Sequence, residues 1–180
     1  EGKGWKGYNT DCMGALKAIE KHVDLKNKNV LIIGAGGTAK AIGQGVYEKG
    51  AKITVTYNRD KEKGIQLGRE LEAKVVSIQE IDNEEIDVLI NCSPVGMSPN
   101  LEETPISSRC LRKGMVVFDS VYNPLETRLI REAKVAGCVT ISGVELFVNQ
   151  AVGQFELWTR QKAPAELMRD VVLQGLDSKI

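Results

Sequence analysis

The 180-residue sequence has little of what marks several classes of protein. It has one histidine, His22, and four widely spaced cysteines with no Cys-x-x-Cys pair, a pattern that argues against a zinc site and a disulfide framework. We therefore expect reduced thiols and an intracellular compartment. Aromatic residues make up only 5% of the chain, and basic and acidic residues balance at 24 each. No overall charge is available to attract nucleic acid or an anionic membrane.

Long apolar runs are also missing. None approaches the roughly 20 residues needed to cross a bilayer, and no signal-peptide pattern is visible in the printed residues. We expect neither a membrane nor a nucleic acid as partner. With 42% hydrophobic and 27% charged residues, the composition is typical of a globular protein, and it predicts one domain over residues 1–180.

The sequence does contain a glycine cluster directly after a β-branched run. Val30-Leu31-Ile32-Ile33 predicts a buried strand, and Gly34-Ala35-Gly36-Gly37-Thr38 opens a helix expected to continue to Lys49. Free N–H groups and the helix dipole favour a phosphate at such a turn, and glycine lets a ligand approach the main chain closely. The pattern Gly34-x-Gly36-Gly37-x-Ala39 is typical of dinucleotide binding. A turn that is merely tight is the alternative.

Strands and helices alternate along the rest of the chain, a pattern that predicts right-handed crossovers and a parallel sheet. The fold class is therefore α/β, doubly wound, with helices on both faces and strand order 3-2-1-4-5-6. Ligands in such sheets lie beyond the carboxyl ends of the strands, where the order reverses. We expect Thr10 or Asp11 to cap the first helix. Further strands are expected at 52–57, 75–76, 86–91, 115–119 and 139–141, and further helices at 12–22, 60–72, 126–136, 144–159 and 165–176.

The choice of cofactor is usually decided at the end of the second strand, where an acid binds the ribose 2′-hydroxyl of NAD. Here the sequence reads Tyr57-Asn58-Arg59-Asp60-Lys61, so no acid closes the strand. The Arg59 guanidinium matches a 2′-phosphate in charge and fork geometry, which favours NADP over NAD. Asp60 would repel that phosphate unless it faces away as a helix cap. A solvated basic helix start is the alternative interpretation.

Six motifs together resemble the shikimate dehydrogenase family, in that family's order. The resemblance implies reversible NADP-linked hydride transfer between 3-dehydroshikimate and shikimate, in aromatic amino-acid biosynthesis. It also implies a cytoplasmic protein, or one in the plastid stroma if the source is a plant. The motifs are Gly7–Asp11, Gly34–Gly37, Asn58-Arg59, Asn91–Met97, Asp119–Pro124 with Thr127, and Gly143–Gln150 followed by Phe155–Trp158.

The resemblance also implies roles for single residues. Asp11 is similar to the family's catalytic aspartate, which works with a lysine that protonates the reacting oxygen, although spacing alone favours an ordinary helix cap. Asn9, Tyr122 and Gln150 resemble substrate-side positions, with a core-edge aromatic and an exposed amide as the alternatives for the last two. The implied cofactor-binding residues are Gly34, Ala35, Gly36, Gly37, Thr38, Asn58, Arg59, Asp60, Cys92, Ser93, Pro94, Val121 and Gly143.

The sequence departs from the family pattern in three ways. Asp60 stands where a threonine is frequent, Leu146 stands where a methionine is frequent, and the family's catalytic lysine belongs to an N-terminal substrate lobe that these residues do not supply. We therefore expect a cofactor-binding lobe that binds NADP(H), shares its small-molecule substrate with a missing lobe, and turns over poorly alone. We expect residues 1–26 and 144–180 to include the helices that connect the two lobes, which would then expose the apolar residues Leu16, Leu157, Trp158 and Leu167.

Three other functions stay open at this point. A quinate dehydrogenase of the same family would share fold and mechanism, but it would act on a substrate with an extra hydroxyl group. A non-catalytic nucleotide-sensing module belongs to a different class. A domain like that of glutamyl-tRNA reductase is the third possibility.

Overall fold

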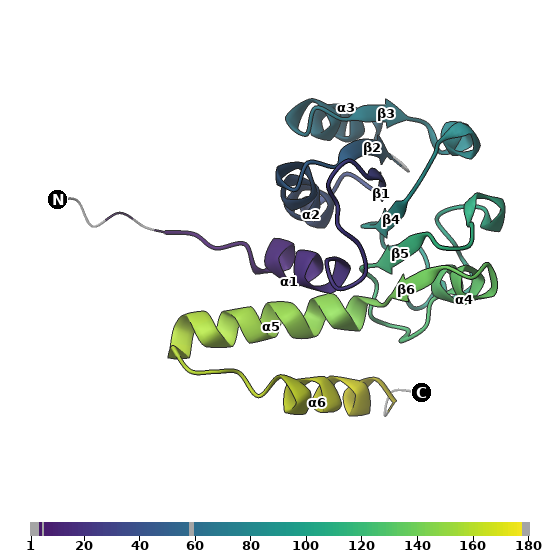
Figure 1. Cartoon of the computed structure of the whole chain (residues 1–180). Coiled ribbons are helices and arrows are strands. Elements are labelled where there is room, and N and C mark those ends of the chain that lie inside the picture. Colours follow the sequence, from purple (N-terminus) through teal and green to yellow (C-terminus); the bar gives the residue numbers. More distant parts are fainter. Residues whose placement is uncertain (1–3, 5, 58–59, 178–180) are drawn as a thin grey trace.

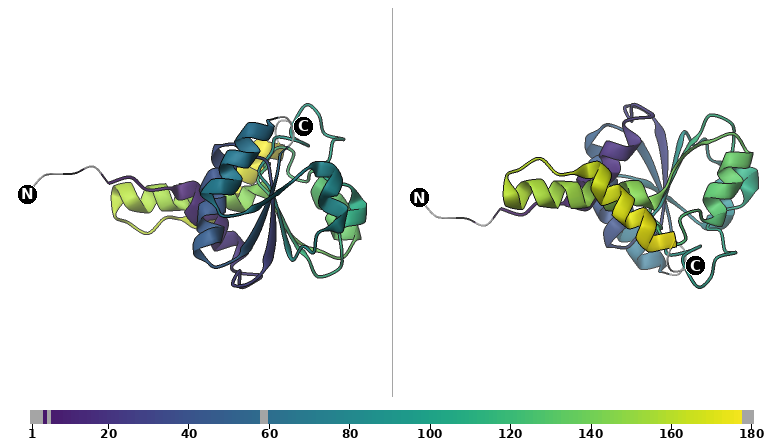
Figure 2. Two further views of the ribbon diagram at one scale, coloured as in Figure 1. Left: turned by 90° about the horizontal axis from the view of Figure 1, so that it is seen from above. Right: turned by 90° about the horizontal axis from the view of Figure 1, so that it is seen from below.

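The computed structural model describes residues 4, 6–57 and 60–177. Its centre is a six-stranded sheet in the order β3-β2-β1-β4-β5-β6, and every pair of neighbouring strands is parallel. Helices cover both faces of this sheet (Figure 1, Figure 2). The predicted doubly wound α/β fold and its strand order are confirmed. Two predicted cofactor contacts, Asn58 and Arg59, lie outside the described residues.

Every predicted strand and helix is present, with ends shifted by a few residues. Two short 3-10 helices were not predicted. The strands are β1 (Asn29–Ile33), β2 (Lys52–Thr56), β3 (Lys74–Val76), β4 (Val88–Asn91), β5 (Val116–Asp119) and β6 (Val139–Ile141). The helices are α1 (Thr10–Ile19), α2 (Gly37–Glu48), α3 (Lys61–Glu70), η1 (Ile78–Asn83), η2 (Ser108–Cys110), α4 (Arg128–Val135), α5 (Gly143–Thr159) and α6 (Ala165–Asp177).

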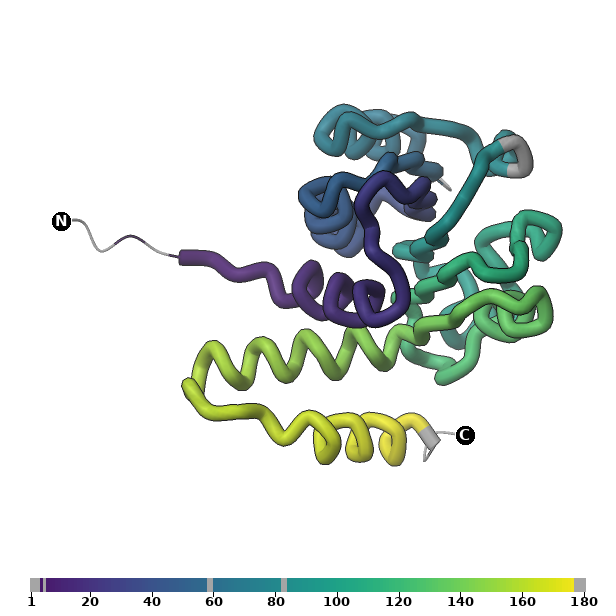
Figure 3. Tube along the Cα trace, in the orientation of Figure 1, coloured from purple at the N-terminus to yellow at the C-terminus, as the bar shows by residue number. Residues whose placement is uncertain are grey.

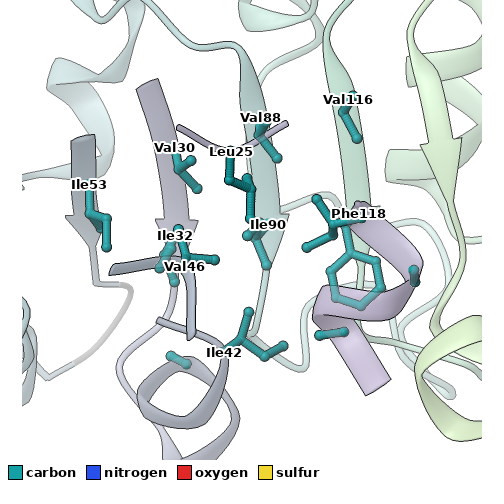
Figure 4. Close-up of a cluster of buried hydrophobic side chains, with 14 of the residues drawn as sticks. Leu25, Val30, Ile32, Ile42, Val46, Ile53, Val88, Ile90, Val116 and Phe118 are labelled. Atoms are coloured by element: carbon teal, nitrogen blue, oxygen red, sulfur yellow. The ribbon is translucent and has the colours of Figure 1, made fainter. Parts of the chain in front are cut away.

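The central strands are buried on both faces because successive side chains point to opposite sides of the sheet. Val30 and Ile32 of β1 pack with Ile90 against Ile42 and other residues of α2 (Figure 4). Their neighbours in sequence, such as Leu31 and Ile33, belong to a second core on the other face, which includes residues of η1 and α4. Burial on both faces explains why the strands appear in the sequence as continuous apolar runs.

Helix α1 lies between α2 and α5, and a glycine permits each contact. A Cβ on Gly14 would lie 3.0 Å from the Gln150 nitrogen of α5, and a Cβ on Gly45 of α2 would lie 2.5 Å from the Cys12 Sγ. Figure 3 shows α5 passing along α1, and α6 returning beside α5. Contact between α5 and α6 buries Val148 and Val152. The helices expected to bridge two lobes therefore form one layer at the edge of this domain.

The expectation that Thr10 or Asp11 caps α1 is wrong. The Asn9 side chain is the cap, and it accepts a hydrogen bond from the Cys12 nitrogen at 3.0 Å. The Thr10 hydroxyl instead accepts one from Gln154 Nε2 at 3.1 Å, which links α1 to α5. A tertiary contact thus uses the side chain that spacing alone assigned to the cap.

Some apolar side chains on this layer are exposed, as expected. Trp158 is 78% exposed and Leu167 is 61% exposed, whereas Leu16 and Leu157 are half-buried.

Within the described part of the chain, no helix combines the length and apolar character needed to span a membrane.

Helix α5 allows a matched test of glycine packing. A Cβ on Gly143 would lie 2.4 Å from the Val121 carbonyl oxygen, whereas the nearest atom to a Cβ on Gly153 is 3.7 Å away. We expect Gly143→Ala to lower the free energy of unfolding by about 1–3 kcal/mol, as overpacking does. Gly153→Ala should leave it unchanged or raise it by up to about 1 kcal/mol, because alanine favours a helix interior. Urea denaturation of both variants measures the difference, and equal effects would contradict the packing described.

Candidate functional site

The parallel arrangement brings the carboxyl ends of all six strands to one edge of the sheet. Ile33 of β1 is paired with Thr56 on one side and Asn91 on the other. Asn91 is in turn paired with Asp119 of β5. The order reverses at β1, which has β2 on one side and β4 on the other. In this architecture, a ligand-binding crevice is expected at that position.

A cleft of about 550 Å³ opens at this reversal. Of the predicted cofactor residues, it contains Gly34, Ala35 and Gly36 of the glycine turn, Asp60 after β2, and Cys92–Pro94 after β4, while Gly37 lines a smaller neighbouring cleft of about 330 Å³. Thr38, Val121 and Gly143 are not in the lining of the larger cleft. Its lining residues are Gly34, Ala35, Gly36, Tyr57, Asp60, Lys63, Cys92, Ser93, Pro94, Val95, Met97, Ser98, Pro99, Asn100 and Glu103.

The first glycine of the turn is required by the fold itself. Gly34 has a φ of +108°, and its N–H donates to the Thr56 carbonyl at 2.8 Å. A Cβ at this position would lie 3.1 Å from the Cys92 carbonyl oxygen. Gly34 is therefore held between the ends of β2 and β4, in a conformation that side-chain-bearing residues rarely adopt.

The next two glycines are different, because packing does not require them. A Cβ on Gly36 or Gly37 would have no atom outside its immediate neighbours within 4 Å, and Gly36 has a φ of −87°. Gly36 is also the cap of α2, and it offers no side-chain acceptor to the first N–H groups of that helix. Ala39 is fully buried on the inner side of the helix. The outer side thus has open space beside backbone donors, which suits a pyrophosphate group.

A buried polar network holds two of the loops at this edge. Asn91 and Asp119, at the ends of β4 and β5, are both 0% exposed. The Asn91 Nδ2 donates to Asp119 Oδ1 at 2.9 Å, and the Ser93 hydroxyl donates to Asn91 Oδ1 at 2.6 Å. The Thr127 hydroxyl donates to Asp119 Oδ2 at 2.6 Å, and the Val121 N–H donates to Oδ1 at 3.1 Å. One carboxylate therefore connects the loop after β4 to the start of α4.

Burial also changes the acid–base behaviour at this edge. Desolvation raises the pKa of Asp119, and the hydrogen bonds from Thr127, Val121 and Asn91 only partly oppose it. Cys92 packs against the core, and burial raises the pKa of its thiol, with the nearby Asp119 charge as the second cause. The Cys92 side chain is consequently a neutral thiol at physiological pH and is unsuited to act as a nucleophile.

The predicted substrate-side residues lie on α1, α5 and the loop after β5. Asp11 lies in the first turn of α1, and Asn9 precedes it as the cap. Gln150 lies on α5, where its backbone meets Gly14 of α1. The Tyr122 ring packs against Phe147 of α5, with ring centroids 4.9 Å apart. Direct packing between these three segments therefore sets the relative positions of all four residues.

Gly143 stands at the junction of α5 and the loop after β5. A Cβ at this position would lie 2.4 Å from the Val121 carbonyl oxygen and 2.6 Å from that of Ser120, so close packing accounts for this glycine. Sequence reasoning assigned Gly143 and Val121 to the cofactor and missed this contact. It also missed the hydrogen-bond network around Asp119 and Thr127. The sequence does contain a signal for this network, because the buried strands β4 and β5 each end in a polar residue.

A second cleft, of about 660 Å³, lies between α1, α4, α5 and α6. Although it is larger, its charged groups are paired within the protein, as in the contacts Glu126–Lys134 at 2.5 Å and Lys21–Glu145 at 3.8 Å. It contains none of the predicted site residues. Across the described residues, no cluster of histidine, cysteine or acidic side chains could hold a metal ion. The cleft at the glycine turn is therefore the candidate site.

Comparison with protein families identifies the family of the chain. Residues 16–139 match the family described as shikimate/quinate 5-dehydrogenase, and residues 143–173 match the shikimate 5′-dehydrogenase C-terminal domain. The chain belongs to the shikimate/quinate 5-dehydrogenase family. The resemblance drawn from the six sequence motifs is confirmed.

Two curated relatives of the chain are longer than it is. A bifunctional 3-dehydroquinate dehydratase/shikimate dehydrogenase from Arabidopsis thaliana is 44% identical over 178 residues, covering 89% of this chain and 29% of that protein. A shikimate dehydrogenase (NADP(+)) from Methanosarcina acetivorans is 41% identical over 184 residues, covering 96% of this chain and 65% of that protein.

The fold agrees with that of solved family members. A crystal structure of a shikimate dehydrogenase in complex with NADP⁺ superimposes with a TM-score of 0.88 at 34% identity. The match covers 94% of this chain and 62% of that one. The chain thus spans about two thirds of this structure and of the archaeal relative.

The buried carboxyl of Asp119 predicts a pH dependence of stability. Because its pKa in the folded chain is raised above the usual Asp value of about 3.9, the folded state binds the proton more tightly than the unfolded state. The associated stabilisation is complete below the unfolded pKa and is lost as pH rises through the folded pKa. Urea denaturation at a series of acidic pH values should show this loss in the wild-type chain relative to Asp119→Asn. A stability difference that does not change with pH would contradict the assignment.

Proposed function

We propose that this chain is the NADP-binding part of a shikimate dehydrogenase, which reversibly reduces 3-dehydroshikimate to shikimate. The observation that carries the proposal is the pair Gly36 and Gly37. Glycine at these positions faces open space beside the uncapped start of α2, so a ligand explains it and packing does not. Family membership supports the same cofactor, and so do the name of the Methanosarcina relative and the crystal structure described above, both of which specify NADP⁺.

The residues present fit such a cofactor along the length of the cleft. The backbone N–H groups of Ala35–Thr38 would hold the pyrophosphate, with support from the α2 dipole, while the Gly34 N–H is bonded to the Thr56 carbonyl. Asn58 and Arg59 follow the end of β2, where an arginine suits a 2′-phosphate. The network around Asn91 and Asp119 fixes the loops that border the nicotinamide half. In our assignment, the cofactor residues of those loops are Cys92, Ser93, Pro94 and Val121, and Gly143 at the start of α5 joins them.

NADPH, when bound, supplies the hydride that reduces the substrate carbonyl. Negative charge then develops on the carbonyl oxygen, and a proton donor must be within reach. We assign Asp11 to this side of the reaction, paired with a lysine from a substrate lobe outside these 180 residues. Asn9, Tyr122 and Gln150 are assigned to substrate contacts beside it. The isolated chain should accordingly bind cofactor and show little or no turnover.

The family description covers quinate as well as shikimate, so quinate is the second candidate substrate. Quinate carries one more hydroxyl group, and a site built to hydrogen-bond a hydroxyl rejects a substrate that lacks it. Rates with each substrate, measured after this chain is joined to a substrate lobe, separate the two functions. We propose the cytoplasm as the location, or the plastid stroma if the source is a plant.

Gly36→Ser tests the proposal directly. Serine is a favoured helix cap, so α2 should keep its start, while the added side chain would fill the phosphate space and compete for the first N–H groups. We expect the affinity for NADPH, followed by its fluorescence on titration into the chain, to fall at least tenfold. The thermal unfolding midpoint should stay close to that of the wild type.

Gly153→Ala is the matched control, because Gly153 lies outside both clefts at the glycine turn, and it should bind NADPH as the wild type does. Equal affinity of Gly36→Ser and the wild type would overturn the pyrophosphate assignment. Failure of the wild-type chain to bind either dinucleotide would overturn the proposed function itself.

A further inference from the structure

We propose that Arg128 is a positioning residue of the dinucleotide site, because it holds one part of the cleft lining in place from helix α4. The part that it holds is the segment Met97–Glu103, which follows the loop after β4. The inference rests on the proposed function, which assigns the cleft of the glycine turn to NADP. Arg128 itself lies outside the lining of that cleft.

The 97–103 segment forms part of the cleft lining. Met97–Asn100 and Glu103 line the cleft together with the glycine turn and with residues that follow β2. The Met97 side chain is 45% exposed, so it is accessible to a ligand. A dinucleotide bound at the glycine turn would therefore border on this segment.

The segment has no regular structure of its own, since it is neither helix nor strand. Its internal backbone bonds are those of turns. The Asn100 N–H donates to the Met97 carbonyl at 2.9 Å, and the Glu103 N–H donates to the Asn100 carbonyl at 3.2 Å. A segment of this kind opens locally at low cost unless neighbouring elements hold it.

Helix α4 and the loop after β5 supply such contacts. The Arg128 Nη1 donates a hydrogen bond to the Glu102 carbonyl oxygen at 2.8 Å. The Ser98 N–H donates to the Asn123 carbonyl at 3.2 Å. The segment is thus bonded to other parts of the chain near its start and near its end.

The two ends of the segment come together beside the cap of α4. A Cβ on Gly96 would lie 3.1 Å from the Glu103 carbonyl oxygen and 3.7 Å from the Cβ of Thr127, the N-cap residue of α4. The segment is therefore a closed loop that rests on the first turn of α4. Arg128, the residue after Thr127, is the side chain of that turn that bonds to the loop.

A second bond fixes the direction of the Arg128 guanidinium group. Its Nε donates to Glu132 Oε1 at 2.7 Å. Because the guanidinium is planar and its donors have a fixed arrangement, this bond directs Nη1 toward the Glu102 carbonyl. Arg131 contacts the Glu102 carboxylate at 3.4 Å, but that side chain is 82% exposed, and an exposed ion pair contributes little. The position of the segment therefore depends chiefly on Arg128.

The effect on binding follows from the fraction of chains in which the segment is in place. The apparent dissociation constant of a ligand rises by the inverse of that fraction. The Arg128 side chain is 43% exposed, and contacts at exposed positions change an equilibrium constant by about fivefold or less. We therefore expect loss of the Arg128 contacts to weaken NADPH binding by about threefold to fivefold.

The test is Arg128→Gln, which removes the guanidinium and keeps a good helix former in α4. Titration of NADPH into the chain, followed by its fluorescence, should give a dissociation constant about threefold to fivefold above that of the wild type. The ¹⁵N order parameters of the amides in 97–103 should fall, while those of β1 stay unchanged. A general loss of stability would not produce this local change. If Arg128→Gln unfolds because Glu132 loses its partner, the double variant with Glu132→Gln removes both charges and permits the same comparison.

Two control variants identify the cause. Lys134→Gln also removes one positive charge from α4 and also leaves a glutamate unpaired, since Lys134 lies 2.5 Å from Glu126, but it acts in the second cleft. Glu102→Gln removes the ion pair with Arg131 and keeps the carbonyl group that Arg128 binds. Neither variant should weaken NADPH binding or change the order parameters of 97–103.

Three results would overturn this inference alone. They are an NADPH affinity of Arg128→Gln equal to that of the wild type, order parameters in 97–103 that do not change, or an equal loss of affinity in either control variant. A wild-type chain that binds neither NADPH nor NADH would instead overturn the proposed function together with this inference.

Discussion

The cleft depends on a single close approach, at Gly34. This residue lies between the ends of β2 and β4, bonded to the Thr56 carbonyl at 2.8 Å and packed against the Cys92 carbonyl. A side chain there would separate the two strands that flank β1, at the place where the strand order reverses. Because Gly34 has none, the chain turns directly from β1 into α2, and the start of that helix faces the cleft.

The glycine motif therefore combines two different physical requirements. Gly34 serves the fold, because its φ of +108° is rarely adopted by residues with a side chain and a Cβ would lie only 3.1 Å from the Cys92 carbonyl oxygen. Packing does not require Gly36 and Gly37, because a Cβ on either would have no atom within 4 Å outside its immediate neighbours, and in our proposal they serve the ligand. The buried Asp119 carboxylate complements the turn by fixing the loops after β4 and β5 through hydrogen bonds within the protein. The contacts that position these loops therefore lie within the protein itself.

The sequence was sufficient to predict the architecture. Alternating strands and helices permit few topologies when crossovers are right-handed and short, so the order β3-β2-β1-β4-β5-β6 followed from local patterns. The convergence of the glycine turn with Asp60 and the Cys92–Pro94 loop followed from the same rule. These features depend on periodicity and on strand direction, which the sequence records directly.

Features that depend on contacts between distant segments could not be predicted. The cap of α1 was misassigned because Thr10 is bonded to Gln154, 144 residues away. Gly143 was assigned to the cofactor because the sequence alone does not show that the Val121 carbonyl lies too close for a Cβ at this position. The sequence also raised the question of which way Asp60 faces. In the structure, Asp60 caps α3 and also lines the cleft beside Lys63.

The most direct test of the central claim is a ¹⁵N–¹H NMR titration of this chain with NADPH. If the glycine turn is the pyrophosphate site, the largest shift changes should fall on the backbone amides of 34–38, with smaller changes in the loop after Asn91. Changes that are centred instead on the second cleft, around Lys21, Lys134 and Arg169, would contradict the account. So would a spectrum that NADPH leaves unchanged.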